Sequence, residues 1–291
     1  VAYIADINRF KKKIREDKIN NGELSYFKSI DPNKINYKFI NNWFDIGSKE
    51  QKQKAENFFR TRNILPKFDQ GIFFKNKKVY KFFTNPDIVK KRYLRSKILN
   101  SFVPIITTKK KYFYVYDYIP GKVFSKLNNK RKNFIYLLDW LKSKFWKKKK
   151  LNEIKKLDFK KKCNNFYYEK SLSRINFLYE KNNIKDSRDI INKKKVNKIS
   201  ELFDKIDWQK LNDGLPVNFH GDLHFENIVM NKKKITLLDW REDFSELNEY
   251  GDLYYDLAKI NHGLIISHDV IESSKYKILI SKKNISLNFY Q

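Results

Sequence analysis

Asp222, Asn227 and Asp239 have the side-chain types and the spacing that phosphoryl transfer requires. Transfer of a γ-phosphoryl group needs a carboxylate that orients and deprotonates the acceptor hydroxyl, oxygen ligands for Mg²⁺, and a cation on the phosphates. Asn227 follows Asp222 by five residues, and Asp239 comes twelve residues later. One acid can therefore act as a base, while an Asn/Asp pair supplies the hard oxygen atoms that Mg²⁺ prefers.

The chain between Asn227 and Asp239 is predicted to be a β-hairpin. Residues 228–230 are apolar, residues 235–238 are apolar except for Thr236, and the two segments flank the polar turn 231–234. A hairpin folds back on itself, so it can return Asp239 to the side of the loop that precedes the first strand.

Upstream, the pattern predicts a small strand-rich lobe. Residues 71–74 and 79–83 flank a Lys- and Asn-rich turn and should form a second hairpin. Asn85-Pro86-Asp87 combines a cap residue, a first-turn proline and a first-turn acid, and it predicts the start of a helix. A further strand is expected from Lys111 to Tyr116, ending in a turn at 117–121.

Apolar spacing predicts helices elsewhere. On the helix that begins near residue 86, the expected i,i+4 apolar pairs are Val89/Tyr93 and Leu94/Ile98. Beyond the turn, three apolar stripes predict a helical lobe: Phe134, Leu137, Leu138, Leu141 and Phe145; Tyr168, Leu172, Ile175 and Tyr179; and Val196, Ile199, Leu202 and Phe203. Nearer the N-terminus, Ser48 lies three residues before Gln51, a capping-box spacing that opens a short helix to about Arg60.

Composition indicates a globular protein. The chain has 291 residues, and its 41% hydrophobic content is sufficient for a packed core. No apolar run approaches the roughly 20 residues that a membrane-spanning helix needs, and no secretory signal is visible, so we expect a cytoplasmic protein. The single cysteine, Cys163, cannot form an internal disulfide.

The formal net charge of +30 would suit a nucleic acid, an anionic lipid or a polyanionic substrate. However, Lys, Asn, Ile and Phe are all abundant while Gly, Pro and Met are scarce, which is typical of an AT-rich coding bias. The lysine runs are also scattered along the chain, at 11–13, 109–111, 147–150, 160–162, 193–195 and 232–234. We therefore interpret most of the charge as solvated surface and expect no nucleic-acid partner, with an anion-binding face as the alternative.

The segment 220–227, His-Gly-Asp-Leu-His-Phe-Glu-Asn, together with Leu238-Asp239-Trp240, resembles the catalytic signature of aminoglycoside and choline phosphotransferases, relatives of the protein kinases. Residues 250–259 are similar to the Gly-Asp-x-x-x-Asp-Leu-Ala segment of the same family. The resemblance implies an α+β, two-lobed protein-kinase-like fold, with a small antiparallel-sheet N-lobe and a larger helical C-lobe. It also implies ATP and Mg²⁺ as cofactors.

The resemblance also implies roles for individual residues. Asp222 would be the catalytic base, and Asn227 and Asp239 would hold Mg²⁺. His220 is predicted with Asp222 as a catalytic residue, and its role would be to support the loop. Asp256 would anchor the loop from the following helix. His224, by contrast, is expected to be a packing or hydrogen-bonding residue.

Lys81 resembles the strand lysine that protein-kinase-like enzymes direct at the α- and β-phosphates, with Lys78 as the alternative. The sequence departs from that pattern, because residues 86–100 lack the glutamate that usually pairs with this lysine, and Asp87 is better explained as a first-turn acid. A glycine-rich phosphate loop is also missing. The partner of the lysine therefore stays open.

Asp117-Tyr118-Ile119, before Pro120-Gly121, looks like the interlobe connection whose backbone groups would hold adenine. The competing interpretation is an ordinary turn at the end of a strand.

The acceptor is the least determined part of the site. Candidate residues follow the metal-binding aspartate and lie on the next helix: Trp240, Arg241, Glu242, Asp243, Tyr254 and His262. Aromatic side chains with acids could enclose a quaternary amine such as choline. Arg241 instead favours an anionic or sugar-phosphate acceptor. The competing interpretation is that these aromatic residues belong to the core.

The motifs look most like those of phosphotransferases among bacterial surface-polysaccharide enzymes, in which a nucleotidyltransferase domain can precede the kinase. Residues 1–60 resemble the tail of such a sugar nucleotidyltransferase domain. We therefore expect an N-terminal extension at 1–60, an N-lobe at 61–117 and a C-lobe at 118–291, in a chain that could be a fragment of a longer bifunctional protein.

These observations favour a small-molecule kinase that phosphorylates a hydroxyl of an amino alcohol or sugar. The alternative is a catalytically weak kinase-like module that binds nucleic acid or another polyanion, which the charge and the missing glutamate favour. A protein kinase is disfavoured because Trp240-Arg241 replaces the Phe-Gly expected after the metal-binding aspartate.

Overall fold

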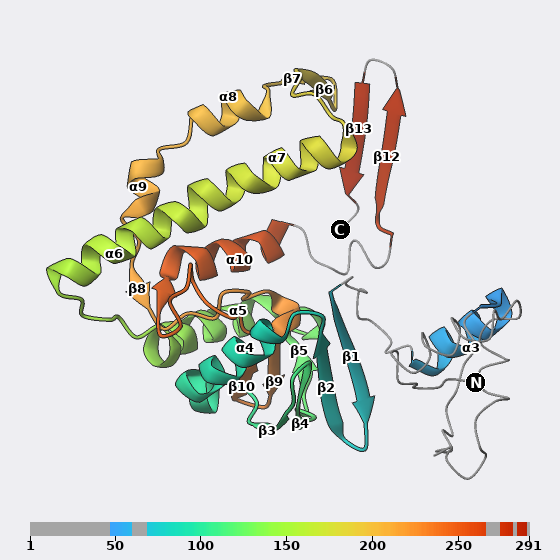
Figure 1. Cartoon of the computed structure of the whole chain (residues 1–291), viewed down its shortest axis with the longest axis vertical. Coiled ribbons are helices and arrows are strands. Elements are labelled where there is room, and N and C mark those ends of the chain that lie inside the picture. The colour runs from blue at the N-terminus through green and yellow to red at the C-terminus, as the bar shows by residue number, and fades with distance from the viewer. Residues whose placement is uncertain (1–46, 60–68, 266–273, 282–283, 290–291) are drawn as a thin grey trace, which may run out of the picture. The chain divides into compact units, whose positions relative to one another are not determined.

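The computed structural model describes residues 47–59, 69–265, 274–281 and 284–289 (Figure 1). The chain divides into two compact units, Val1–Arg60 and Thr61–Gln291. No helix within the described ranges is long and apolar enough to cross a membrane.

In the first unit the described element is α3 (Lys49–Phe59). The Gln51 amide donates to the Ser48 hydroxyl oxygen at 3.2 Å, so the predicted N-terminal cap is confirmed. The rest of the segment that resembles a nucleotidyltransferase tail, residues 1–46, lies outside the described residues.

The second unit begins with a four-stranded antiparallel sheet of order β1-β2-β4-β3, formed by β1 (Gln70–Lys75), β2 (Lys78–Phe83), β3 (Ile106–Lys109) and β4 (Phe113–Asp117). The predicted hairpin is confirmed as β1 and β2, joined at Asn76 and Lys77, which both have positive φ angles as a tight hairpin turn requires. On β2, Val79, Lys81 and Phe83 are buried and alternate with less buried neighbours. Lys81 therefore points to the core face of the sheet.

Helix α4 (Pro86–Leu99) begins where the sequence predicted. The Asn85 side chain accepts a hydrogen bond from the Asp87 amide at 2.9 Å, and Pro86 occupies the first turn. The buried face differs from the predicted one: Val89, Arg95, Ser96 and Leu99 are buried, whereas Leu94 and Ile98 are exposed. The i,i+4 pair Leu94/Ile98 is thus not the packing face of this helix.

The helical part starts with α5 (Lys130–Trp140), which continues into a π-helical turn, Leu141–Phe145. α6 (Glu153–Asn164), a second π-helical turn (Asn165–Glu169) and α7 (Lys170–Asn182) then form one continuous helical stretch. Figure 1 shows α6 and α7 in line with each other.

After α7 the structure departs from the sequence prediction. Val196, expected on a helical stripe, ends strand β7 (Lys194–Val196), which pairs with β6 (Asp189–Ile191). Helix α8 (Ile199–Asp204) starts only afterwards and is followed by α9 (Trp208–Asn212). β6 and β7 join β12 (Tyr276–Ser281) and β13 (Asn284–Phe289) in a four-stranded sheet that the sequence did not predict.

The remaining elements carry the motif. β8 (Pro216–Val217) pairs with β11 (Gly251–Asp252), and α10 (Leu253–Ile265) follows β11. β9 (Ile228–Asn231) and β10 (Lys234–Leu237) form the predicted hairpin, and β5 (Lys122–Val123) pairs with β9. One apolar core joins residues of the β1–β4 sheet, α4, α5 and the β9–β10 hairpin. An α+β fold with a small antiparallel sheet and a larger helical part is confirmed.

Candidate active site

The loop before β9 is fixed by a buried carboxylate on α10. Asp256 is fully buried, and its two oxygen atoms accept hydrogen bonds from the backbone amides of His220 and Gly221, each at 2.8 Å. The Trp146 indole N–H also donates to Asp256, at 3.1 Å. Burial raises the pKa of Asp256 to about 6, although these hydrogen bonds favour its charged form. The predicted anchoring role of Asp256 is confirmed by these contacts.

Gly221 allows this loop to pass close to the chain that follows β10. Its φ angle is +85°, and a Cβ atom at this position would lie 2.5 Å from Cβ of Arg241. The Arg241 amide donates to the His220 carbonyl at 2.9 Å. Both the backbone conformation and the close approach therefore require glycine.

His220 supports the loop from inside the protein. The side chain is completely buried, and its Nδ1 atom accepts a hydrogen bond from the Asp222 amide at 3.2 Å. Burial lowers the pKa of His220 to about 4, so the imidazole is neutral at pH 7. Its buried position matches a structural support better than a proton carrier.

Asp222 is surrounded by groups that favour its ionised form. Its Oδ1 atom lies 3.1 Å from Lys259 Nζ and 3.3 Å from His224 Nε2, and its Oδ2 atom accepts from the Asn227 amide group at 3.3 Å. Burial alone would raise the pKa of Asp222, but the hydrogen bond from His224 and the charge of Lys259 hold it well below its ordinary value. The side chain is 30% exposed, so an ionised carboxylate faces the site.

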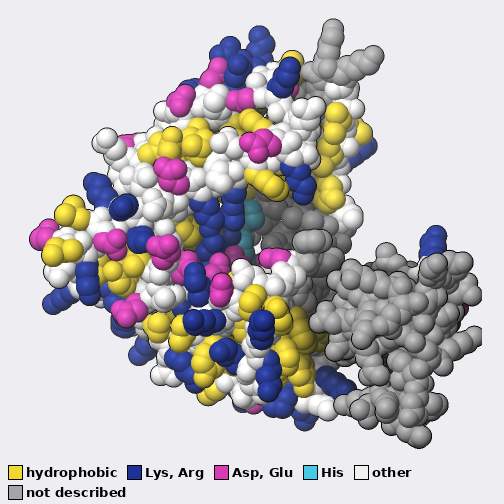
Figure 2. All heavy atoms as spheres, viewed as in Figure 1, with side chains coloured by type: hydrophobic (Ala, Val, Ile, Leu, Met, Phe, Trp, Pro, Cys, Tyr) yellow, Lys and Arg dark blue, Asp and Glu magenta, His cyan; other side chains and the backbone are white. Residues whose placement is uncertain are grey.

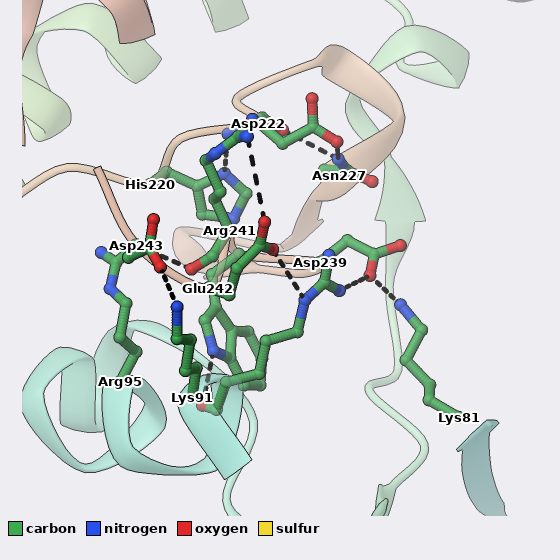
Figure 3. Close-up of polar contacts among 12 residues, drawn as sticks. Lys81, Lys91, Arg95, His220, Asp222, Asn227, Asp239, Arg241, Glu242 and Asp243 are labelled. Carbon is green, nitrogen blue, oxygen red and sulfur yellow. Dashed lines mark hydrogen bonds and ion pairs between the residues drawn. The ribbon is translucent and has the colours of Figure 1, made fainter. Parts of the chain in front are cut away.

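The β9–β10 hairpin brings Asp239 next to Asn227, as predicted (Figure 3). Ile228 pairs with Leu237, and the Leu238 amide donates to the Asn227 carbonyl at 2.7 Å. Asp239 follows directly, with a φ of +61° that few residues other than glycine adopt. Aspartate is one of the few residues other than glycine that tolerate this conformation, so the turn after β10 can carry a carboxylate at this position.

Two cations from the N-terminal part of this unit contact Asp239. Lys81 forms an ion pair with its Oδ1 atom, and the Arg92 guanidinium lies 2.9 Å from the same oxygen. The Lys81 side chain is only 3% exposed. The lysine whose partner the sequence left open thus pairs with the predicted metal ligand itself, while Lys78 pairs with the exposed carboxylate of Asp117 at 3.0 Å.

The structure adds three cations that sequence reasoning did not assign to the site. Arg92 and Arg95 lie on α4, and Lys259 lies on α10. Arg95 is completely buried, and its guanidinium donates to the carbonyl oxygens of Arg241 at 2.7 Å and Phe219 at 2.5 Å. For Lys259 a signal existed, because it lies three residues after the anchoring aspartate and so shares its helix face.

The predicted adenine-binding residues lie at the end of β4. The Tyr118 amide donates to the Lys77 carbonyl at 2.8 Å, and the Tyr118 ring is largely exposed. Ile119 is half-buried, and the Asp117 carboxylate faces solvent beside Lys78. Of the three backbone amides, that of Tyr118 is therefore already used within the sheet.

The prediction that Trp240 helps to bind the acceptor is wrong. Its side chain is 1% exposed, its ring stacks on Tyr114, and its indole N–H donates to the Arg92 carbonyl at 2.9 Å. Trp240 therefore belongs to the core and cannot line an acceptor pocket.

Glu242 and Asp243 contact cations of α4. Glu242 lies 3.6 Å from Arg92, and Asp243 lies 2.7 Å from Lys91 (Figure 3). These acids hold the segment after β10 to α4, and their charge is already partly compensated.

Two of the remaining acceptor candidates lie on α10. Tyr254 is 52% exposed, and the His262 ring lies 5.4 Å from the ring of His224, the residue that contacts Asp222. Arg241 is half-buried beside Gly221. Arg241 and His262 are thus brought close to the loop that carries Asp222.

Comparison with known proteins places this site in a family. The model of the phosphotransferase enzyme family (APH) matches residues 105–262, more than half of the chain, including the hairpin and its flanking motifs. Nothing among the curated proteins matches the chain. Two solved structures show limited similarity. The streptomycin-ATP-APH(2")-IIa ternary complex has a TM-score of 0.38 and 16% identity, over 72% of this chain and 73% of that one. The gentamicin-APH(2")-IIa complex has a TM-score of 0.35 and 13% identity, with the same coverage.

Proposed function

The chain belongs to the phosphotransferase enzyme family, and from that premise we propose that it transfers the γ-phosphoryl group of ATP to a hydroxyl group of a small molecule. One observation carries the proposal: the β9–β10 hairpin returns the carboxylate of Asp239, which follows β10, to the loop before β9 that carries an ionised Asp222 and the amide of Asn227. A fold without catalytic duty would have no need of all three.

In this proposal Asp222 orients the acceptor hydroxyl. Its low pKa makes it a weak base before reaction, so it accepts the proton only as the new O–P bond forms and the bond to ADP breaks. Lys259 and His224 hold the carboxylate in place and compensate its charge.

Asn227 and Asp239 fit Mg²⁺. The Asn227 NH₂ group is turned to Asp222, donating to its carbonyl oxygen at 2.8 Å, so the amide oxygen points away from that carboxylate. The described residues contain no cluster of three or more His, Cys, Asp or Glu side chains suited to a metal. An amide oxygen and one carboxylate suit Mg²⁺ when phosphate oxygens and water complete the shell. A bound Mg²⁺ would neutralise charge on the transferred phosphate.

Lys81 would contact the α- and β-phosphates of ATP, exchanging its ion pair with Asp239 for a phosphate oxygen. The connection after β4 would hold adenine through backbone groups of Asp117 and Ile119, because the Tyr118 amide is occupied. We also propose that residues 61–117 and 118–291 act as two lobes around the nucleotide, with residues 1–60 as an extension. An intracellular location is part of this proposal, since ATP would be the donor.

The test is ATP turnover with Mg²⁺ against choline, ethanolamine and simple sugars, comparing the native protein with Asp222→Asn. We expect the variant to bind ATP but to lose about 10²- to 10⁴-fold in kcat, the range for general-base catalysis. Asp213→Asn is the matched control, because Asp213 is an exposed carboxylate that pairs with Lys160 at the surface.

Two outcomes would contradict the proposal. If Asp222→Asn and Asp213→Asn turn over ATP equally, Asp222 is not the base. If the native protein binds nucleotide and phosphorylates nothing, while it binds RNA tightly and in a salt-sensitive way, the protein is instead a polyanion-binding module.

A further inference from the structure

Three cations lie together on one side of the catalytic loop and take no part in the chemistry above. Lys170 and Arg174 lie four residues apart on α7, and so share one helix face. Lys170 Nζ lies 4.4 Å from the centroid of the Phe166 ring, and the Arg241 guanidinium carbon lies 5.0 Å from the same centroid. Phe166 therefore brings a cation of α7 and a cation of the segment after β10 into one cluster.

The positive charge of this cluster is poorly compensated. Arg241 lies 3.8 Å from Glu242, but Glu242 is shared with Arg92. Within the described ranges, neither Lys170 nor Arg174 has a carboxylate within 4.0 Å, and the buried Nε atom of Arg241 has no hydrogen-bond partner. Burial and the charges of Arg241 and Arg174 lower the pKa of Lys170 to about 8. Half-buried cations whose charge is only partly compensated, such as Lys170 and Arg241, cost stability unless an anion binds there.

The cluster lies beside the catalytic carboxylate. Arg241 packs against Gly221, the neighbour of Asp222. The Phe166 ring also meets Tyr255 edge-on at 4.8 Å, and Tyr255 lies 5.7 Å from Lys259, which contacts Asp222. Figure 2 shows Lys and Arg side chains gathered beside histidine side chains on the face in view.

A local irregularity of the helix positions this cluster. Phe166 lies in the π-helical turn Asn165–Glu169, and Lys170 follows that turn directly. Such turns alter the direction of side chains within a long helix and are frequent at functional sites.

We propose that Lys170, Arg174 and Arg241 bind a phosphate or carboxylate group of the acceptor, so that the substrate is a small anionic compound with a free hydroxyl. This rests on the proposed phosphotransferase function and deepens it. The Arg241 fork can contact two oxygen atoms of the anion, while Lys170 supplies a point charge. The same cluster would repel a quaternary amine, so choline is disfavoured as the acceptor.

The experiment compares three acceptors that share one scaffold: glucose, glucose 6-phosphate and glucosamine. Binding is measured by calorimetry with the full chain, Mg²⁺ and a saturating non-hydrolysable ATP analogue, so that phosphate cannot enter the nucleotide site. We expect glucose 6-phosphate to bind at least about tenfold more tightly than glucose, and glucosamine more weakly than glucose. Lys170→Gln and Arg241→Gln should each weaken glucose 6-phosphate binding by about tenfold.

Lys181→Gln is the matched control. Lys181 lies on the same helix, carries the same charge and also lies over a phenylalanine ring, Phe177, at 5.6 Å. Binding of glucose 6-phosphate to Lys181→Gln should stay within about twofold of the native protein, because a distant surface charge is screened. Arg241→Lys keeps the positive charge and so tests whether the guanidinium itself is needed. A thermal melt of every variant shows whether weaker binding is caused by unfolding.

If glucose and glucose 6-phosphate bind equally tightly, the proposed anion site is wrong. If Lys170→Gln and Lys181→Gln lose the same affinity for glucose 6-phosphate, binding depends on the overall charge, and the proposed site is again wrong. Tighter binding of glucosamine would also overturn it. Failure of the phosphotransferase function looks different: glucose 6-phosphate would bind in a Lys170-dependent way, yet no acceptor would yield ADP and a phosphoester. RNA could also compete with glucose 6-phosphate for binding. If Lys170→Gln, Arg241→Gln and Lys181→Gln all reduced that competition equally, the result would count against a small-molecule site.

Discussion

At the level of single residues, the most unusual feature is the pairing of Asp239. A kinase-like strand lysine is expected to pair with a glutamate on the next helix, but here α4 presents Arg92, and Lys81 pairs with Asp239 directly. The acids that face α4 come instead from the segment after β10, as Glu242 and Asp243. In this protein the helix therefore supplies cations to the site, where a protein-kinase-like enzyme is expected to supply a carboxylate.

Arg92→Met should lower the free energy of unfolding by about 2 kcal/mol, because it removes a hydrogen-bonded cation from two partly buried carboxylates. Urea unfolding followed by circular dichroism measures this loss. Lys90→Met is the control, since Lys90 is an exposed cation of the same helix. Equal midpoints for both variants would show that Arg92 contributes no more than a surface charge.

The pH dependence of anion binding should report Lys170. Its pKa of about 8 is lower than that of an ordinary lysine, so the side chain loses its charge as the pH rises through 8. Affinity for glucose 6-phosphate should therefore fall between pH 7 and pH 9.5, a range in which the phosphate keeps its charge. Lys170→Arg should bind equally at both pH values, because arginine stays protonated. A native protein with constant affinity over this range would contradict the role of Lys170.

At the level of elements, the sequence alone predicted the helices and hairpins that are bounded by capping residues or by short polar turns. Asn85, Pro86 and Asp87 defined the start of α4, and apolar strands around short polar turns defined the β1–β2 and β9–β10 hairpins. Each of these features depends on hydrogen bonds between residues close in sequence, so no knowledge of tertiary contacts was needed.

Predictions failed where tertiary contacts decide burial. On α4 the apolar Leu94 and Ile98 are exposed, while Arg95 is buried because two distant carbonyl groups satisfy its guanidinium. Strands β6 and β7 are three residues each and pair with each other, and β6 also pairs with β13 from the far end of the chain, a contact that no local pattern encodes. Spacing identified the motif acids, but the cations that face them come from other elements and were largely missed.

The contact between α10 and the catalytic loop should be visible in the pH profile. Asp222 stays ionised in mild acid because its pKa is low, whereas Asp256, with a pKa of about 6, gains a proton there and loses acceptor strength toward the loop amides. Activity (kcat/KM) of the native protein should therefore fall below about pH 6. The kcat/KM of Asp256→Asn at pH 7.5 should be about 10- to 100-fold lower than that of the native protein, which corresponds to about 1.4 to 2.7 kcal/mol of lost hydrogen bonding. The fall in activity below about pH 6, the acid limb of the profile, should be absent in this variant.

Asp252→Asn is the control for that experiment. Asp252 is also a buried aspartate, but its partners are Tyr167 and the amides of Leu215 and Tyr254, which do not belong to the catalytic loop. Its substitution should lower stability and leave the acid limb in place. Persistence of the limb in Asp256→Asn would assign it to another group.

At the level of the whole molecule, the formal charge of +30 has two opposite consequences. Spread over the surface, it destabilises the compact state through self-repulsion. Concentrated beside the catalytic loop, as in the Lys170, Arg174 and Arg241 cluster, it favours binding of an anion. Salt separates the two effects, since it screens repulsion among surface cations and also weakens attraction for a charged acceptor.

Raising NaCl from 0.01 to 0.15 M shortens the screening length from about 30 Å to about 8 Å. The urea midpoint of the protein should therefore rise, while the affinity for glucose 6-phosphate falls and that for glucose stays constant. Surface ion pairs predict the opposite change in stability, because pairs such as Lys78–Asp117 and Arg188–Glu201 weaken in salt. A midpoint that falls with salt would show that these specific pairs outweigh the net charge. Because glucose has no charge to screen, a parallel loss of its affinity would mean that salt alters the site itself.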